Sequence, residues 1–136
     1  MGRGFTRFKY HQNINEPVVV FSLSVSTSIF LYRHPVDMRK SFNGLENIVR
    51  GILNEDPLSG HLFVFINKKR NKLKVLYWDL DGFCILYKNL QRGTFLDSLS
   101  NINSNTIIEP AVFYMLFNGI DIHQIKRRKR FKIPHT

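Results

Sequence analysis

Hydrophobic and polar positions alternate with different periods along the chain, and these periods predict its secondary structure. Residues 62–66, 73–78 and 83–87 are short runs rich in branched and aromatic side chains, separated by a polar stretch at 67–71 and a turn sequence at 79–82. Runs of this kind, joined by short turns, are typical of consecutive antiparallel strands. The pattern therefore predicts a three-stranded meander whose first strand is buried on both faces or nearly so.

One helix is predicted before this meander in the sequence and a shorter one after it. Apolar residues recur every three or four positions between residues 37 and 53, and Asp37 is a favourable N-cap for a helix that begins there. Pro110 is tolerated in the first turn of a second helix, and Gly119 is a typical stop signal for it. The long helix should cover one face of the sheet.

Weaker signals predict further short strands. Alternation of apolar and Ser residues at 21–25, the apolar run at 29–32 and the sequence at 93–95 each indicate one strand. Residues 98–105 are rich in Ser and Asn and are typical of a connector. The resulting fold class is α+β: a small antiparallel sheet packed by one main helix, with a short second helix and a basic C-terminal tail.

The same patterns divide the chain into an arm, one domain and a tail. Residues 1–17 lack apolar periodicity, so we expect a loose arm. A single domain is expected over residues 18–125, and a basic tail over 126–136. Basic residues before Val18 imitate the start of a secretory signal, but the alternation at 21–25 favours a strand over a continuous apolar helix.

The composition makes this domain basic and gives it a core. Twenty Lys and Arg residues face ten Asp and Glu residues, a net charge of +10, and 43% of the residues are hydrophobic. This apolar content excludes a wholly disordered chain. The longest apolar run, residues 111–117, is far shorter than the roughly 18 residues of a membrane span. Cys84 is the only cysteine, which excludes an internal disulfide and a multi-cysteine zinc site.

Positive charge is concentrated in two clusters. The hairpin cluster lies between the first two strands of the meander, and the C-terminal cluster lies in the predicted tail. Such clusters neutralise DNA phosphates and release their counterions, although a solvated turn and a soluble tail would carry the same residues. The candidate DNA-binding residues are Lys68, Lys69, Arg70, Lys72 and Lys74 in the first cluster, and Lys126, Arg127, Arg128, Lys129, Arg130 and Lys132 in the second.

The sequence offers little for catalysis. Asp79, Asp81 and Glu109 are the only carboxylates that suit a two-metal nuclease, whose ions need convergent acidic ligands about 4 Å apart. The first two flank a turn that ends in Gly82, where Asp is favoured for its hydrogen bonds to the backbone, so a structural role is the stronger interpretation. The five histidines lack metal-ligand spacing, and Cys84 lies in an apolar run that is typical of a buried residue. We therefore predict no enzymatic activity, no metal and no cofactor.

Three stretches, residues 34–45, 56–67 and 73–88, resemble the TnpB accessory protein encoded by the second reading frame of insertion sequences of the IS-66 type. The resemblance covers about residues 29–95, and this TnpB is not the RNA-guided nuclease that shares its name. Its signature residues fall mainly on a helix start, a turn and strands, so structural roles are expected, with Trp78 in the core. They are Asp37, Met38, Arg39, Lys40, Phe42, Gly44, Leu45, Gly60, His61, Trp78, Asp79, Gly82, Phe83 and Tyr87.

This resemblance implies a protein of the bacterial cytoplasm that assists DNA transposition without being the transposase. Contact with DNA, or bridging of DNA to the separate transposase, is the function it implies, and the basic clusters support it physically. A protein adaptor that touches only the transposase is the alternative. Family members begin close to residues 21–25, so residues 1–20 are expected to be an extension, with Val19 or Val20 marking a GTG start codon.

Overall fold

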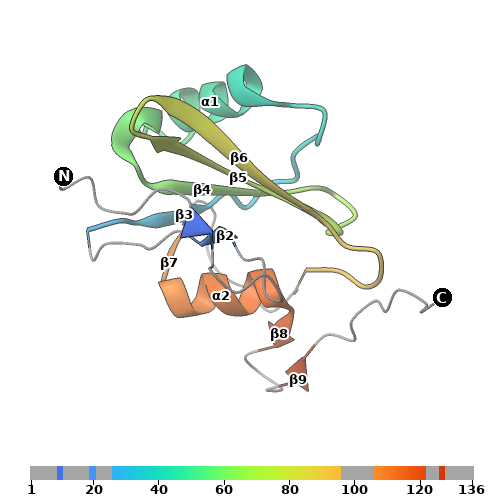
Figure 1. Ribbon diagram of the computed structural model, residues 1–136. Coiled ribbons are helices and arrows are strands. Elements are labelled where there is room, and N and C mark those ends of the chain that lie inside the picture. Colours follow the sequence, from blue (N-terminus) through green and yellow to red (C-terminus); the bar gives the residue numbers. More distant parts are fainter. Residues whose placement is uncertain (1–8, 11–18, 21–25, 96–105, 122–125, 128–136) are drawn as a thin grey trace.

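The computed structural model describes residues 9–10, 19–20, 26–95, 106–121 and 126–127. Two α-helices, one 3-10 helix and nine strands lie in this part of the chain (Figure 1). The helices are α1 (Phe42–Gly51), η1 (Pro57–Ser59) and α2 (Pro110–Asn118). The strands are β1 (Lys9–Tyr10), β2 (Val19–Val20), β3 (Ile29–Leu31), β4 (Leu62–Ile66), β5 (Lys72–Asp79), β6 (Gly82–Asn89), β7 (Thr106–Ile108), β8 (Ile120–Asp121) and β9 (Lys126–Arg127).

A five-stranded sheet in the order β6-β5-β4-β3-β7 forms the centre of the fold. The predicted meander is confirmed, because β4, β5 and β6 pair antiparallel. The sheet as a whole is mixed and not purely antiparallel, since β3 runs parallel to β4. Parallel neighbours need a crossover, and α1 supplies it between these two strands. Strand β7, which the sequence pattern did not indicate, pairs antiparallel with the outer side of β3.

The sheet separates two hydrophobic clusters, with α1 on one side and α2 on the other (Figure 1). Successive side chains along β3, β4 and β5 point to opposite faces of the sheet, as in any pleated strand, so they enter the two clusters alternately. Because β4 contributes to both clusters, all five of its residues are buried, as predicted. The α1-side cluster comprises Phe30, Val36, Leu45, Ile48, Val49, Phe63, Phe65 and Leu76. The α2-side cluster comprises Ile29, Leu31, Leu62, Val64, Ile66, Leu73, Val75, Tyr77, Phe95, Ile108 and Leu116.

The first helix starts later than its apolar periodicity predicts. Residues 37–40 form a turn in which Asp37 Oδ1 accepts the backbone N–H of Arg39 at 2.9 Å, and Ser41 is the N-cap. The prediction of Asp37 as the N-cap is therefore wrong. In the turn, the carbonyl oxygens of Met38 and Lys40 accept hydrogen bonds from Lys74 Nζ on β5. In a continuous helix these carbonyls would instead accept the backbone N–H groups four residues later. The second helix has its predicted bounds, with Gly119 left-handed at φ +74°.

Several short predicted segments have other outcomes. The strand predicted at residues 93–95 is absent, because these residues form bends; Phe95 is instead fully buried and donates its N–H to Arg70 O at 2.6 Å. The strand predicted at 21–25 and the connector at 98–105 lie outside the described residues. Within the predicted arm, Lys9–Tyr10 pairs with Val19–Val20, and the rest of residues 1–17 lies outside the described part.

The turn after η1 provides a stability test. Gly60 has φ +88°, a conformation that costs other residues about 1 to 2 kcal/mol, so Gly60→Ala is expected to lower the free energy of unfolding by that amount. Gly51 is the matched control, since it is helical and a Cβ added there meets no atom within 4 Å. Gly51→Ala is expected to stabilise the protein by up to about 1 kcal/mol. Chemical denaturation measures both, and equal effects of the two changes would contradict this assignment.

Candidate nucleic-acid interface

The loop between β4 and β5, residues 67–71, is held in shape by the side chain of Asn67. Its Oδ1 accepts the backbone N–H groups of Asn71 and Lys72, both at 3.0 Å, and its Nδ2 donates to Asn71 Oδ1 at 2.8 Å. These bonds satisfy backbone groups that would otherwise have no partner in the turn. The loop therefore presents the exposed side chains of Lys68 and Lys69 from an ordered backbone.

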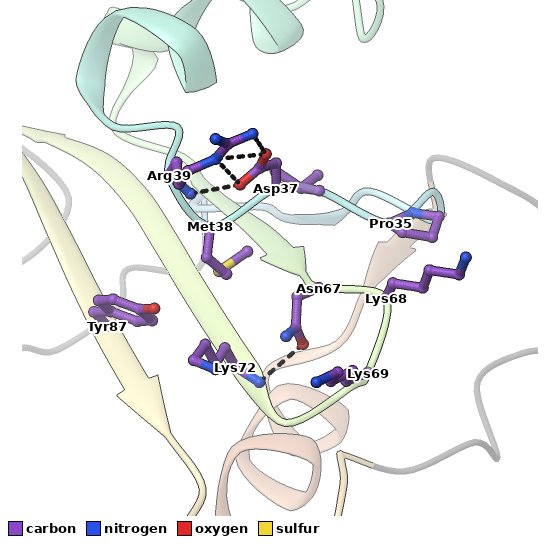
Figure 2. A pocket seen from close by; sticks show the side chains of 10 residues that line it. Pro35, Asp37, Met38, Arg39, Asn67, Lys68, Lys69, Lys72 and Tyr87 are labelled. Atoms are coloured by element: carbon purple, nitrogen blue, oxygen red, sulfur yellow. Dashed lines mark hydrogen bonds and ion pairs between the residues drawn. The ribbon is translucent and has the colours of Figure 1, made fainter.

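An open groove of about 620 Å³ lies between this loop and residues 35–39. Figure 2 shows Lys68 and Lys69 on the loop, Lys72 at the start of β5 and Tyr87 on β6 around it. The other lining residues are Pro35, Val36, Asp37, Met38, Arg39 and Asn67. Among the described residues, four cationic side chains and one carboxylate line the groove, which gives this part of it a positive charge.

The carboxylate of Asp37, the only one that the described residues contribute to the groove, is already paired. Arg39 Nη2 lies 2.7 Å from Asp37 Oδ2, and Arg39 Nε donates to both carboxylate oxygens (Figure 2). The hydrogen bonds from Arg39 lower the pKa of Asp37 to about 2, so the carboxylate stays ionised at neutral pH and its charge is matched locally. The remaining cations of the groove are Lys68, Lys69 and Lys72.

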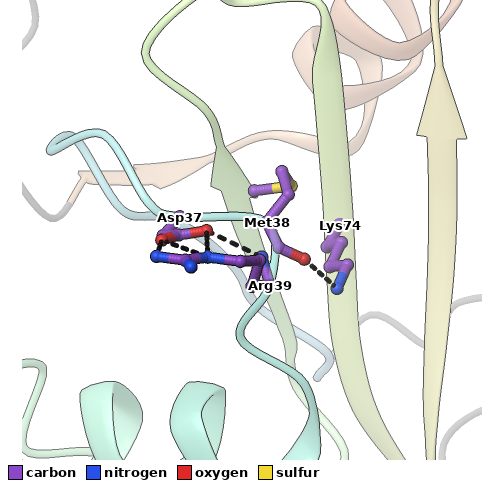
Figure 3. Close-up of polar contacts among 4 residues, drawn as sticks. All are labelled: Asp37, Met38, Arg39 and Lys74. Carbon is purple, nitrogen blue, oxygen red and sulfur yellow. Dashed lines mark hydrogen bonds and ion pairs between the residues drawn. The ribbon is translucent and has the colours of Figure 1, made fainter.

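Lys74, which the sequence grouped with the DNA-binding candidates, is part of the folded interior. Its side chain is only 6% exposed, and Nζ donates to Met38 O at 2.8 Å and to Lys40 O at 2.7 Å. Figure 3 shows Lys74 reaching from β5 to the turn before α1. The Tyr87 ring lies beneath the ammonium, 4.7 Å from Nζ to the ring centroid, and burial lowers the pKa of Lys74. We conclude that Lys74 joins the turn to the sheet and is not available to a phosphate.

Arg70 is directed away from the groove as well. It has a left-handed backbone, φ +60°, and its Nε donates to Phe95 O at 3.3 Å. The side chain lines a second, smaller cavity of about 80 Å³. Arg33, which sequence reasoning missed, lines the same cavity. A single cation at the end of an apolar strand gives no periodic or cluster signal, so nothing in the sequence distinguished it.

The remaining signature residues occupy different environments. Trp78 is only partly buried and belongs to neither cluster; its ring meets Phe83 edge-on, with 5.0 Å between centroids, so the expectation of a core tryptophan is wrong.

Leu45 is fully buried, Asp79 is buried, and Phe42 is exposed. His61 Nδ1 accepts the N–H of Ser28 at 2.9 Å. Gly82 opens β6, and the left-handed residue of its turn is Leu80. Lys40 packs close beside Gly44.

The carboxylates considered for a metal site are not brought together. Asp79 ends β5 and Glu109 follows β7, and β4 and β3 lie between these strands. At about 4.8 Å per strand the separation is roughly 14 Å, too far for shared ligation. The described residues contain no group of three or more His, Cys, Asp or Glu side chains that could hold a metal ion. Cys84 is half-buried and packs on the α2-side cluster.

The C-terminal cluster lies largely beyond the described residues. The backbone of Lys126 and Arg127 forms β9 and pairs with β8, and Arg128, Lys129, Arg130 and Lys132 are outside the described part. Of the helices that the structure describes, none has the length and apolar character needed to cross a bilayer.

Comparisons with known proteins match most of the chain to one family. Residues 27–127 match the family model described as IS66 Orf2 like protein. The chain is similar to the uncharacterized protein y4jC of Sinorhizobium fredii (strain NGR234), with 33% identity over 101 residues, covering 74% of this chain and 85% of y4jC. It is also similar to y4hO of the same strain, with 38% identity over 85 residues, 62% of this chain and 73% of y4hO. No solved structure matches the chain.

Proposed function

The chain belongs to the IS66 Orf2-like family of transposition accessory proteins, and from this premise we propose that it assists the separate transposase by binding DNA phosphates through the groove beside the β4–β5 loop. The protein acts without catalysing a reaction of its own and works in the bacterial cytoplasm, where the DNA and the transposase are. The C-terminal cluster is a second DNA contact.

The charge of the groove is the observation that carries this proposal. Lys68, Lys69 and Lys72 line it together with the Asp37–Arg39 pair, which is close to neutral. Each exposed ammonium neutralises one phosphate and releases a condensed counterion, and this release is the main source of sequence-independent affinity. The Asn67 hydrogen bonds support the same conclusion, because a fixed loop loses less conformational entropy when it binds.

The groove favours contact with the DNA backbone over recognition of base sequence. Its cations are mainly lysines, which act as compact point charges and lack the rigid fork with which Arg reads guanine. Phosphate contacts position a protein on DNA but carry no sequence information directly. The proposed role is therefore to hold or bridge DNA for a transposase that recognises its own target.

A salt titration of duplex binding tests the proposal. In a plot of log K against log salt concentration, Lys69→Glu is expected to reduce the magnitude of the slope by about 0.9, and Lys68→Glu with Lys69→Glu by about 2. Arg50→Glu is the matched control for Lys69→Glu, since it changes the net charge equally from an exposed position on α1 outside the groove. Its slope should equal that of the wild type. A chain that ends at Arg127 keeps β9 and tests the C-terminal cluster in the same titration.

An adaptor that contacts only the transposase is the second candidate, and one observation favours it. Ile107 on β7 and Tyr114 on α2 are large apolar side chains that are mostly exposed. If the wild type shows no salt-dependent affinity for duplex or single-stranded DNA, the groove proposal is wrong and the adaptor takes its place. A pull-down from cells that carry the whole element, with and without nuclease, then distinguishes direct from DNA-mediated capture of the transposase.

A further inference from the structure

Strand β6 is accessible to solvent along its whole length. Its eight residues pair with β5 on one side, and in the part of the chain that the structure describes β6 is the last strand at this edge of the sheet (Figure 1). Every residue of β6 is at least partly exposed, whereas all five residues of β4 are buried. An edge strand presents backbone N–H and C=O groups with which another extended strand can pair.

The features that protect an edge strand from such pairing are absent from β6. Natural sheets shorten an edge strand, interrupt it with a bulge or a proline, or give it charged side chains. Strand β6 has an unbroken register of eight pairs and no proline, and Lys88 is its only charged residue. The Lys88 ammonium is bound on the α2 side, because Nζ donates to Phe117 O at 2.6 Å and lies 4.3 Å from the centroid of the Phe117 ring. The edge is therefore suited to pairing.

We propose that β6 pairs antiparallel with β6 of a second copy of this chain, with Ile85 on the twofold axis. The side chains of the strand complement themselves in this register. Phe83 lies opposite the partner's Tyr87, and Cys84 lies opposite the partner's Leu86. Aromatic and apolar pairs of this kind stabilise neighbouring strands. The two five-stranded sheets become one continuous sheet.

The charges along the strand fit a second copy in the antiparallel direction. Lys88 lies opposite the partner's Gly82, which has no side chain, so the two lysines stay at opposite ends of the pair. Asp81, which is exposed, precedes β6, and Arg92, which is exposed, follows it. Antiparallel pairing brings the Asp81 end of one copy to the Arg92 end of the other, whereas parallel pairing brings like charges together. A twofold dimer makes each of these contacts twice.

The twofold axis also places the positive grooves of both copies on one face. In an antiparallel pair this axis is perpendicular to the sheet, so both copies of α1, which covers one face, lie on the same side of the joined sheet. Tyr87 lines the groove of its own copy, so each groove lies beside the junction of the two sheets. On the proposed function, on which this consequence rests, one dimer offers two grooves to DNA.

The mass of the full chain in solution is the first measurement. Light scattering of wild-type protein without DNA, at high salt to screen its positive charge, is expected to approach twice the mass of one chain as the concentration rises. A monomer at every concentration overturns the proposal.

Cysteine cross-linking tests the register. In a Cys84→Ser background, Ile85→Cys places two thiols opposite each other with about 4.5 to 5.5 Å between Cα atoms, within the range of a disulfide, so mild oxidation should link most of the protein into dimers. Asn89→Cys is the matched control, because it is exposed on the same strand but lies four residues from the axis. Its two Cα atoms are roughly 27 Å apart and should not be linked. Linking of Asn89→Cys but not of Ile85→Cys overturns the proposed pairing.

Hydrogen exchange of the wild type keeps the proposal testable if the cysteine variants do not fold. Amides of β6 that point away from β5 are expected to exchange more slowly as the protein concentration rises, because they gain hydrogen-bond partners in the dimer. Amides of β4, which has a strand on each side, should not change. Exchange in β6 that is independent of concentration overturns the proposal.

These measurements contain no DNA and therefore separate the dimer from the groove proposal. If the wild type forms the Ile85-centred dimer but has no salt-dependent affinity for DNA, the groove proposal fails and the dimer stands. If the wild type stays monomeric while Lys69→Glu reduces the salt slope, the dimer proposal fails and the groove stands.

Discussion

Phe63→Ala is expected to lower the free energy of unfolding by roughly 3 to 5 kcal/mol. Phe63 lies in β4 with no exposed surface, and it stacks on Phe30 with 5.3 Å between ring centroids. Removing the ring leaves a cavity between the sheet and α1 that the neighbouring strands cannot fill. Because a domain of this size is stable by only about 5 to 15 kcal/mol, urea denaturation should show a large shift of the midpoint.

Trp78→Ala provides the comparison for this result. Trp78 is larger than Phe63 but lies near the end of β5, half-buried, with Phe83 as its ring partner. A partly exposed side chain buries a smaller fraction of its apolar area, so we expect a smaller cost than that of Phe63→Ala. An equal cost would place Trp78 in the core after all. A variant that folds normally but fails to support transposition would make Trp78 a contact residue.

Lys74→Met is expected to cost roughly 2 to 4 kcal/mol, because it removes the donor of two carbonyl groups at once. The carbonyls of Met38 and Lys40 belong to the turn that precedes α1, and Lys74 Nζ lies within 2.8 Å of both oxygens. Methionine keeps most of the side-chain volume, so the loss measures the polar contacts more than packing. Equilibrium unfolding gives the free energy, and an unchanged stability would show that water replaces the ammonium without cost.

Lys72→Met is the matched control two residues earlier on the same strand. Its side chain is partly buried, lines the groove and makes no hydrogen bond or ion pair with another described residue. We expect a change of stability within about 0.5 kcal/mol, as for ordinary surface positions, and a salt slope reduced in magnitude by about 0.9. Lys74→Met should leave that slope unchanged. The two variants thus distinguish a lysine that stabilises the fold, Lys74, from one that binds DNA, Lys72. A stability loss for Lys72→Met together with a reduced salt slope for Lys74→Met would contradict this assignment.

Local patterns in the sequence determined the elements whose neighbours are close along the chain. The meander of β4, β5 and β6 follows from three apolar runs joined by short turns, since such runs pair with their nearest neighbour. Helix α2 has its predicted bounds because Pro110 and Gly119 act on their own backbone dihedrals. The resemblance to the family likewise lies in local stretches of sequence, residues 34–45, 56–67 and 73–88, and residues 27–127 match the family model.

Only the tertiary structure decided which distant segments meet. The parallel pairing of β3 with β4, and the position of β7 beyond it, depend on contacts between residues far apart in sequence, about which a two-residue period carries no information. The late start of α1 depends in the same way on Lys74. Within the hairpin cluster, Lys68, Lys69, Arg70 and Lys74 have similar charges and neighbours. The fold exposes the first two, places Arg70 in the same cavity wall as Arg33 and buries Lys74. The reason is that a long cationic side chain is stable in a buried position only where its charged end group reaches a hydrogen-bond acceptor.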